Sequence, residues 1–436
     1  MINQLSISLR ENSLFYFMAI VWLIVGIALG NLAIPVITLF ILYLLQKEMY
    51  IELLLGFLFI LAIANSREPA LQFAKPLREV YLILLLVPFF LSSKIRIELN
   101  IVKYFVPFFL VGLGTLFISV DPQIAFLKLL SYFIILLVVP VYVKYLYDEY
   151  GDFFLKHLFY FFVVILSCGF VIHFINPDVT TLSGRFRGVF GNPNGLSTFV
   201  LLSAVLMEII RYFKPGLFTN SERYFFLILA AVALLMSGSR TGLFSLLLFY
   251  VLIYLFNYSR ILGFTFVITA GFAYQLILLY LPEIVYMLNL QDHLRIDNLE
   301  AAGGRIVAFE FAWYHVQNSF WFGHGFAYNE YLFSRFSAML SALGHQGGTH
   351  NAYLSMWLDT GLIGLTLFAG AWGILFWKGS KMGTIALPFA IVIAFSSFFE
   401  GWLASSLNHV TIIMVLNISL LTILGYELND YSDEAI

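Results

Sequence analysis

Long apolar runs, separated by short polar breaks, recur along almost the whole chain. A helix needs about 20 apolar residues to cross the hydrocarbon core of a membrane, and fourteen runs are candidates, although three of them are short. They lie near residues 13–30, 32–46, 50–64, 80–93, 102–119, 125–143, 158–175, 196–211, 223–237, 241–257, 261–281, 351–377, 383–399 and 403–425. Because backbone polar groups in hydrocarbon must be satisfied internally, such runs fold as helices. The pattern predicts an all-α polytopic integral membrane protein with 12–14 transmembrane helices, built as a single membrane domain over residues 1–436.

The composition strengthens this prediction. Of the 436 residues, 61% are hydrophobic and only 11% are charged, whereas an ordinary soluble domain carries about 25% charged residues. A soluble fold of this kind would leave apolar surface that few polar side chains could cover. The composition excludes a soluble enzyme, a disordered protein and a nucleic-acid binder, so we expect membrane lipids as partners and no nucleic acid.

The basic residues predict the orientation. With the N-terminus in the cytoplasm, thirteen of the 23 basic residues fall on the cytoplasmic side, eight of them Lys, and ten fall on the outer side, eight of them Arg. The excess agrees with the positive-inside rule. Orientation requires no preference for Arg over Lys, whereas bidentate recognition of phosphate favours Arg. We therefore expect the functional groups on the outer face.

The largest extramembrane segment is predicted at 282–350, about seventy residues between two apolar runs. Loops of that length are uncommon unless they are functional. Within it, Ile306, Phe309 and Trp313 share one helical face. This spacing predicts a short amphipathic helix, beginning near Gly303, that lies on the outer leaflet.

Two Gly-rich turns at the outer ends of spans carry arginines. In the turn 183–195, Arg185 and Arg187 are suited to clamp a phosphate, and Asn194 is placed to cap the next helix. In the turn 237–242, Arg240 stands between two apolar runs, where a cation in a partly dehydrated setting is usually functional. The alternative in both turns is an arginine that only reaches toward the membrane interface.

Further candidates lie at the starts of two predicted helices and beyond. Arg305 begins the Gly303–Trp313 helix, and its alternative role is a contact with lipid head groups. His350, with Asn351 beside it, precedes the span 351–377 and is placed for general-base chemistry near neutral pH, although a lone His is more often a structural cap. Asp359 is expected to be a satisfied intramembrane group paired with another span, and Glu400 is an alternative carboxylate on the acceptor side. The histidines have no His-x-x-His or Glu-x-x-His spacing, so we expect no metal site and no cofactor.

In their order along the chain, four motifs resemble the O-antigen ligase and O-antigen polymerase superfamily over residues 180–376. They are Arg-x-Arg-Gly-x-Phe-x-Asn-Pro-Asn at 185–194, Ser-Gly-Ser-Arg-Thr at 237–241, Gly-Gly-Arg at 303–305, and His350-Asn351 followed by Gly361 and Gly364. The resemblance implies a metal-independent glycosyltransferase of the bacterial inner membrane, with its active site on the periplasmic face. Its donor would be a glycan on undecaprenyl pyrophosphate. The acceptor would be a lipid A-core sugar for a ligase, or another lipid-linked repeat unit for a polymerase.

By the same resemblance, His350 would deprotonate the acceptor hydroxyl, while Arg185 or Arg187, Arg240 and Arg305 would hold the pyrophosphate leaving group. We accordingly predict His350 and Arg240 as catalytic residues. The predicted substrate-binding residues are Arg185, Arg187, Asn194, Arg305 and Asn351. A single base-assisted displacement would invert the anomeric carbon, and fixed guanidinium groups would stabilise the charge that develops on the leaving oxygen.

Two other classes remain as alternatives. A flippase for lipid-linked oligosaccharides would also have twelve to fourteen spans and arginines for pyrophosphate, but it is often built on internal repeats around a mid-membrane cavity, and no repeat is apparent. A non-catalytic scaffold for polysaccharide assembly would not need His350 and Arg240. Within the superfamily, the count of fourteen candidate spans slightly favours a polymerase over a ligase.

Overall fold

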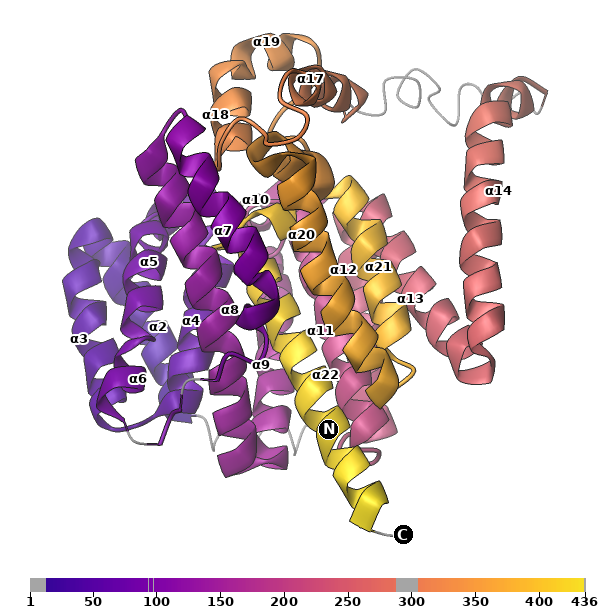
Figure 1. Ribbon diagram of the computed structural model, residues 1–436. Coiled ribbons are helices and arrows are strands. Elements are labelled where there is room, and N and C mark those ends of the chain that lie inside the picture. Colours follow the sequence, from indigo (N-terminus) through magenta and orange to yellow (C-terminus); the bar gives the residue numbers. More distant parts are fainter. Residues whose placement is uncertain (1–12, 93, 97, 288–304, 435–436) are drawn as a thin grey trace.

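A computed structural model describes residues 13–92, 94–96, 98–287 and 305–434, and confirms the all-α prediction (Figure 1). Its one described sheet is a two-stranded antiparallel hairpin in which β1 (Thr181–Leu182) pairs with β2 (Arg185–Phe186). The α-helices are α2 (Ser13–Leu29), α3 (Ala33–Gln46), α4 (Tyr50–Ala64), α5 (Ala74–Leu84), α6 (Val87–Leu91), α7 (Val106–Thr115), α8 (Pro122–Tyr150), α9 (Asp152–Ile175), α10 (Pro177–Thr180), α11 (Pro193–Phe213), α12 (Asn220–Ser237), α13 (Arg240–Tyr258), α14 (Arg260–Met287), α17 (Arg305–Asn318), α18 (Tyr328–Arg335), α19 (Ser337–Ala342), α20 (Ala352–Met382), α21 (Ala386–Phe399) and α22 (His409–Glu434). Short 3₁₀ turns are η1 (Gly30–Leu32), η2 (Pro69–Leu71), η3 (Val102–Phe105), η4 (Leu116–Ile118) and η6 (Trp402–Ala404).

The apolar helices of the bundle differ in length. In the described residues, eight helical stretches are long and apolar enough to cross, and four further apolar helices are 10–17 residues long. The predicted spans at 13–30 and 32–46 fall in one of the eight stretches, Leu14–Gln46. The predicted span at 80–93 is wrong, because α5 ends at Leu84 and α6 begins at Val87. Pro88 explains the second start, since proline lacks a backbone N–H and suits the first turn of a helix.

Two helices form the centre of the bundle. α11 and α22 pack against each other, and α11 and residues 409–424 of α22 are mostly buried, while α8 and α20 pack against α22. Figure 1 shows α22, in yellow, crossing the middle of the molecule. Over these buried turns both sequences are mostly apolar, as expected of helices that have no solvent-facing stripe. A buried side chain links the two helices, because Asn417 Nδ2 of α22 donates to the Leu202 carbonyl of α11 at 3.0 Å.

The described part of the predicted outer segment, residues 305–350, folds against the start of α20. α17 and α18 pack on α20, and these helices share a small core that includes Ala308, Ala312 and Leu332. The predicted face of α17 is therefore not the side that packs on protein, because Ile306 and Trp313 are 42% and 40% exposed. Gly303 lies outside the described residues. α14 continues to Met287, five residues past the predicted start of the segment at residue 282.

α20 is broken in its interior at Gly361, whose φ of 67° and ψ of −175° are not helical. The freed backbone groups bond to the segment 320–325: His324 N–H donates to the Leu358 carbonyl at 2.8 Å, and Leu362 N–H donates to the Phe320 carbonyl at 2.9 Å. These hydrogen bonds satisfy backbone N–H and C=O groups that the hydrocarbon of a membrane could not satisfy. A Cβ at Gly361 would lie 2.2 Å from the Trp321 carbonyl oxygen, so only glycine fits the crossing.

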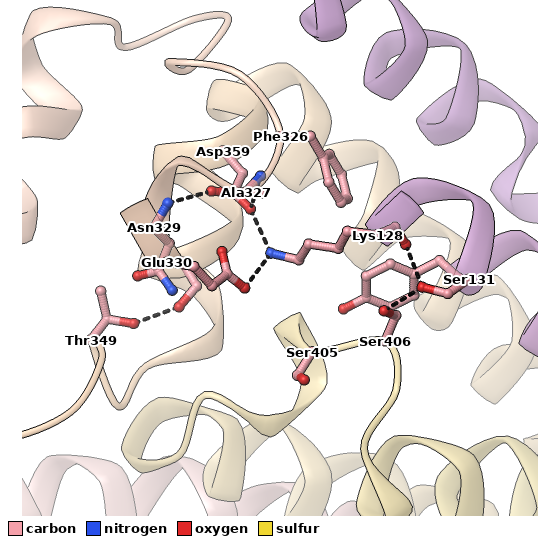
Figure 2. Close-up of polar contacts among 12 residues, drawn as sticks. Lys128, Ser131, Phe326, Ala327, Asn329, Glu330, Thr349, Asp359, Ser405 and Ser406 are labelled. Carbon is pink, nitrogen blue, oxygen red and sulfur yellow. Dashed lines mark hydrogen bonds and ion pairs between the residues drawn. The ribbon is translucent and has the colours of Figure 1, made fainter. Parts of the chain in front are cut away.

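A buried ion-pair network holds this region together (Figure 2). Lys128 of α8 places its Nζ 2.9 Å from Asp359 Oδ2 on α20 and 2.7 Å from Glu330 Oε1 on α18. Asp359 also accepts from the backbone N–H groups of Ala327 at 3.1 Å and Asn329 at 2.8 Å. The expectation that Asp359 is a satisfied group paired with another span is confirmed.

Substitutions of Lys128 and of Glu330 are expected to lower the stability of the protein by different amounts. Lys128 and Asp359 are buried, whereas the Glu330 side chain is 51% exposed. Lys128→Met is expected to cost about 3–5 kcal/mol, because it leaves a buried carboxylate without its cation. Glu330→Gln is expected to cost under about 1 kcal/mol, as for exposed pairs. Thermal unfolding of the purified variants measures both, and equal losses would contradict this account.

Candidate functional site

The centre of the candidate site is an ion pair between the outer segment and the bundle. Arg305, the first residue of α17, places Nη2 2.9 Å from Oε1 of Glu400, which follows the last residue of α21. Glu400 is 8% exposed. Burial raises the pKa of Glu400 to about 7, although Arg305 and Arg185 act in the opposite direction. The carboxyl therefore titrates near neutral pH.

Arg185 joins this pair from β2. Its Nε donates to the Ser237 carbonyl at 2.7 Å and its Nη2 donates to Asn194 Oδ1 at 3.3 Å, so it connects two turns that the sequence places 52 residues apart. Burial lowers the pKa of Arg185, Glu400 raises it and Arg305 lowers it. The guanidinium groups of Arg185 and Arg305 and the carboxyl of Glu400 are therefore close enough to interact electrostatically.

His350 lies next to the same group, immediately before the cap of α20. Its backbone is left-handed, with φ 49°, and its Nε2 donates to the Gln346 carbonyl at 3.2 Å, because a carbonyl can only accept. The Nδ1 atom then carries the lone pair in the neutral ring. Burial lowers the pKa of His350, the hydrogen bond to the Gln346 carbonyl raises it, and Arg305 and His345 lower it, so that the net change is a decrease. His350 is therefore neutral at pH 7 and able to accept a proton.

Asn351 has a structural contact of its own. Its Oδ1 accepts from the Leu354 N–H at 2.9 Å, which caps α20, and the residue is buried. Gly401 lies against this turn, since a Cβ there would lie 3.9 Å from the Asn351 nitrogen and 4.0 Å from His350 Cα. The segment after Glu400 thus contacts the turn that carries His350.

Arg240 is the first residue of α13 and lies at the same end of the bundle as Arg185, beside the turn that Arg185 contacts. Its side chain is exposed, and it makes no hydrogen bond or ion pair to the described residues. Ser237 and Ser239 take the buried positions of this turn, and Ser239 Oγ bonds Ser197 Oγ at 2.8 Å.

Arg187 is held elsewhere. It is 4% exposed and its Nη2 lies 2.5 Å from Glu68 Oε1 and 3.0 Å from the Val179 carbonyl oxygen. Of the two arginines in this turn, it is Arg185 that joins Arg305. The predicted helix cap at Asn194 is wrong, because Asn192 caps α11 by accepting from the Gly195 N–H at 2.7 Å.

Sequence reasoning missed the pairing of Glu400 with Arg305 and that of Glu68 with Arg187. The only signal for Glu400 was an isolated acid at the outer end of an apolar run. Nothing in the sequence connected it to Arg305, which is 95 positions away. Among the described residues, no three His, Cys, Asp or Glu side chains are grouped so as to hold a metal ion.

The fold and the site together define a class: a polytopic all-α membrane protein with arginines, a neutral histidine and a buried carboxyl gathered at one end. A family model described as O-antigen ligase matches residues 225–369, about a third of the chain, which include Arg240, Arg305 and His350. This match supports the O-antigen ligase and polymerase superfamily, and with it a glycosyltransferase type of activity in general. No curated protein matches the chain.

Proposed function

We propose that this protein transfers a glycan from undecaprenyl pyrophosphate to a sugar hydroxyl, at the periplasmic face of the bacterial inner membrane, with inversion and without a metal. The acceptor is a growing lipid-linked glycan in a polymerase or a lipid A-core sugar in a ligase. The observation that carries the proposal is the convergence of Arg185, Arg305 and His350 around Glu400.

In the proposed reaction the acceptor O–H proton passes to Nδ1 of His350, and the acceptor oxygen bonds to the anomeric carbon. The bond from that carbon to the pyrophosphate oxygen breaks, and its electron pair stays on the pyrophosphate. Arg185 and Arg305 are placed to stabilise this charge, and Arg240, exposed at the N-terminus of α13, supplies a third guanidinium. Fixed guanidinium groups of this kind can do so without a metal.

Glu400 has two possible roles in this scheme. In the absence of donor it holds Arg305 in place at 2.9 Å. Because its pKa is near 7, an incoming pyrophosphate would favour protonation of Glu400 and release Arg305 to the donor. The alternative is that Glu400 itself accepts the acceptor proton.

The choice between a polymerase and a ligase rests on the acceptor. The slight preference for a polymerase came from fourteen candidate spans, and the described residues contain eight stretches of sufficient length and four shorter apolar helices. The polysaccharide profile of a deletion strain distinguishes the two activities: single repeats without long chains indicate a polymerase, and polymer accumulating on the lipid carrier indicates a ligase. The flippase alternative has no comparable support, since the matched family describes a ligase.

The proposal predicts transfer by the purified full chain in detergent, with lipid-linked glycan as donor and a chelator present. Product is expected at the same rate with and without the chelator, since guanidinium groups supply the positive charge. The measurement is the conversion of donor to longer or transferred glycan. A strict requirement for added Mg²⁺ or Mn²⁺ would contradict the metal-independent mechanism.

Two substitutions of Arg240 separate the effect of its positive charge from the effect of its planar guanidinium group. Arg240→Lys keeps the charge but loses the planar pair of donors that binds phosphate, and we expect about a 10²-fold loss of turnover, with Arg240→Ala at least as low. Arg67→Lys, an exposed arginine at the same end of the bundle, is the control. Turnover and donor affinity are measured at matched protein levels. Full activity of Arg240→Ala would remove Arg240 from the site.

A further inference from the structure

A second polar region lies at the opposite end of the bundle. There the last turns of α8 and α20 and residues 422–427 of α22 line a cavity of about 810 Å³. Its wall carries Lys103 of η3, Lys144 of α8, Lys378 of α20, and Lys214, which follows α11. A smaller cavity of about 200 Å³ shares Lys144 with it and adds Lys94 and Arg96. Because α20 begins beside His350 of the candidate site and ends here, the cavity is separate from that site.

Only part of this positive charge is neutralised within the described protein. Lys144 pairs with Glu98 at 2.7 Å and Lys214 pairs with Glu427 at 2.9 Å. Lys103 and Lys378 make no ion pair with a described side chain. Both instead lie near the ring of Tyr104, at 5.4 Å and 4.8 Å from its centroid, and Lys378 donates to the Tyr104 hydroxyl. Asp148 and Asp152 also line the cavity, so its charge is mixed, and the cations left to bind an anion directly are Lys103 and Lys378.

The remaining wall is apolar. Ile101, Leu375, Met382 and Ile423 line the same cavity. A wall with lysines on one part and aliphatic side chains on another matches an amphipathic anion, with a phosphate for the ammonium groups and an acyl chain for the apolar residues. The position agrees, since the positive-inside rule assigns this end to the cytoplasm, where anionic lipids attract basic residues near the membrane surface.

We propose that this cavity binds a phosphate group, carried by the head group of an anionic phospholipid from the adjoining leaflet, between Lys103 of η3 and Lys378 of α20. The bound phosphate adds a bridge between η3 and α20, which already pack together through Phe105 against Phe368 and Trp372. The site stabilises the cytoplasmic end of α20, whose other end follows His350. It does not depend on the proposed glycan transfer.

The test uses the full chain in phosphatidylcholine nanodiscs, with and without phosphatidylglycerol, and measures the midpoint of thermal unfolding and the number of lipids retained by native mass spectrometry. Wild type is expected to unfold at a higher temperature with phosphatidylglycerol. The double variant Lys103→Gln/Lys378→Gln is expected to bind that lipid about thirty-fold more weakly, since each lysine near the surface contributes about a fivefold factor. Each single variant should lose about fivefold, which keeps the test valid if the double variant does not fold.

Lys381→Gln is the matched control, because Lys381 is exposed on the same turn of α20 and does not line the cavity. It should keep the wild-type response. A second arm adds glycerol 3-phosphate to phosphatidylcholine nanodiscs: stabilisation there that is lost in the double variant supports the phosphate site but assigns it to a soluble ligand. The proposal is overturned if phosphatidylglycerol stabilises all variants equally, which would indicate diffuse surface attraction, or if neither ligand affects wild type.

Discussion

His350→Ala is expected to lower turnover by about 10²–10⁴-fold, the range that a positioned general base contributes, while donor binding persists. The histidine is neutral at pH 7, because burial and Arg305 lower its pKa, and its Nδ1 is free of the bond that Nε2 makes to Gln346. The arginines that hold the donor are unchanged in this variant. Single-turnover transfer and donor affinity, measured at matched protein levels, separate the two effects.

His345→Gln provides the comparison for His350→Ala. His345 is buried, its Nε2 bonds the Gly348 carbonyl at 3.0 Å, and its ring lies 5.6 Å from that of His350. We expect it to support the turn and to affect stability more than chemistry. Near-normal turnover in His350→Ala together with a large loss in His345→Gln would assign the base to His345.

The pH dependence of kcat/KM distinguishes His350 from Glu400 as the base. A base acts when deprotonated, so activity falls as the pH drops through its pKa. The pKa of His350 is lowered from 6.5, whereas that of Glu400 is raised to about 7. If His350 is the base, the acid limb lies below pH 6.5 and remains in Glu400→Gln. A limb near pH 7 that disappears in Glu400→Gln would identify Glu400 instead.

Arg305→Gln is expected to lower turnover by about 10²–10³-fold, as does removal of other fixed groups that stabilise developing charge. Arg305 is the cleaner choice than Arg185, whose Nε also bonds the Ser237 carbonyl and supports the fold. The same variant removes a group that lowers the pKa of Glu400, so that pKa is expected to rise above 7. The carboxyl stretch in infrared spectra reports this shift.

Arg335→Gln is the control for Arg305→Gln. Arg335 ends α18 on the same outer segment, is exposed, and makes no ion pair with the described residues. Its turnover should stay near wild type, since no group of the candidate site contacts it. Normal turnover in Arg305→Gln would leave Arg185 and Arg240 to hold the leaving group.

The sequence predicted the fold class and the nature of the isolated charges, because hydrocarbon penalises both strongly. Apolar runs must become helices, and Asp359 in such a run must have a cation, which is Lys128. The sequence did not show which of Arg185 and Arg187 joins the candidate site. An uninterrupted strand would put both on one face, but β2 ends at Phe186 and Gly188 turns the chain with φ 56°, which sends Arg187 to Glu68.

Other outcomes depended on tertiary structure that no local pattern contains. In the turn 237–240 the buried side chains are Ser237 and Ser239, while Arg240 is exposed, and the meeting of α17 with the end of α21 decides that Glu400 faces Arg305. Helix length was also misjudged around Pro88, where one apolar run contains two short helices. In each case the type of residue could be interpreted from the sequence, but the residues that it contacts in the fold could not be predicted.

The break at Gly361 does not make α20 a hinge. The segment 320–325 holds the two halves of the helix together. His324 N–H donates to the Leu358 carbonyl before the break, and the Phe320 carbonyl accepts from Leu362 N–H after it. The tilt of the half-helix that begins beside His350 is therefore set by the conformation of the outer segment and not by α20 alone. Exchanging this segment between related proteins would reposition His350 at the same time as it changed the surface offered to an acceptor, so these two properties are expected to be inherited together.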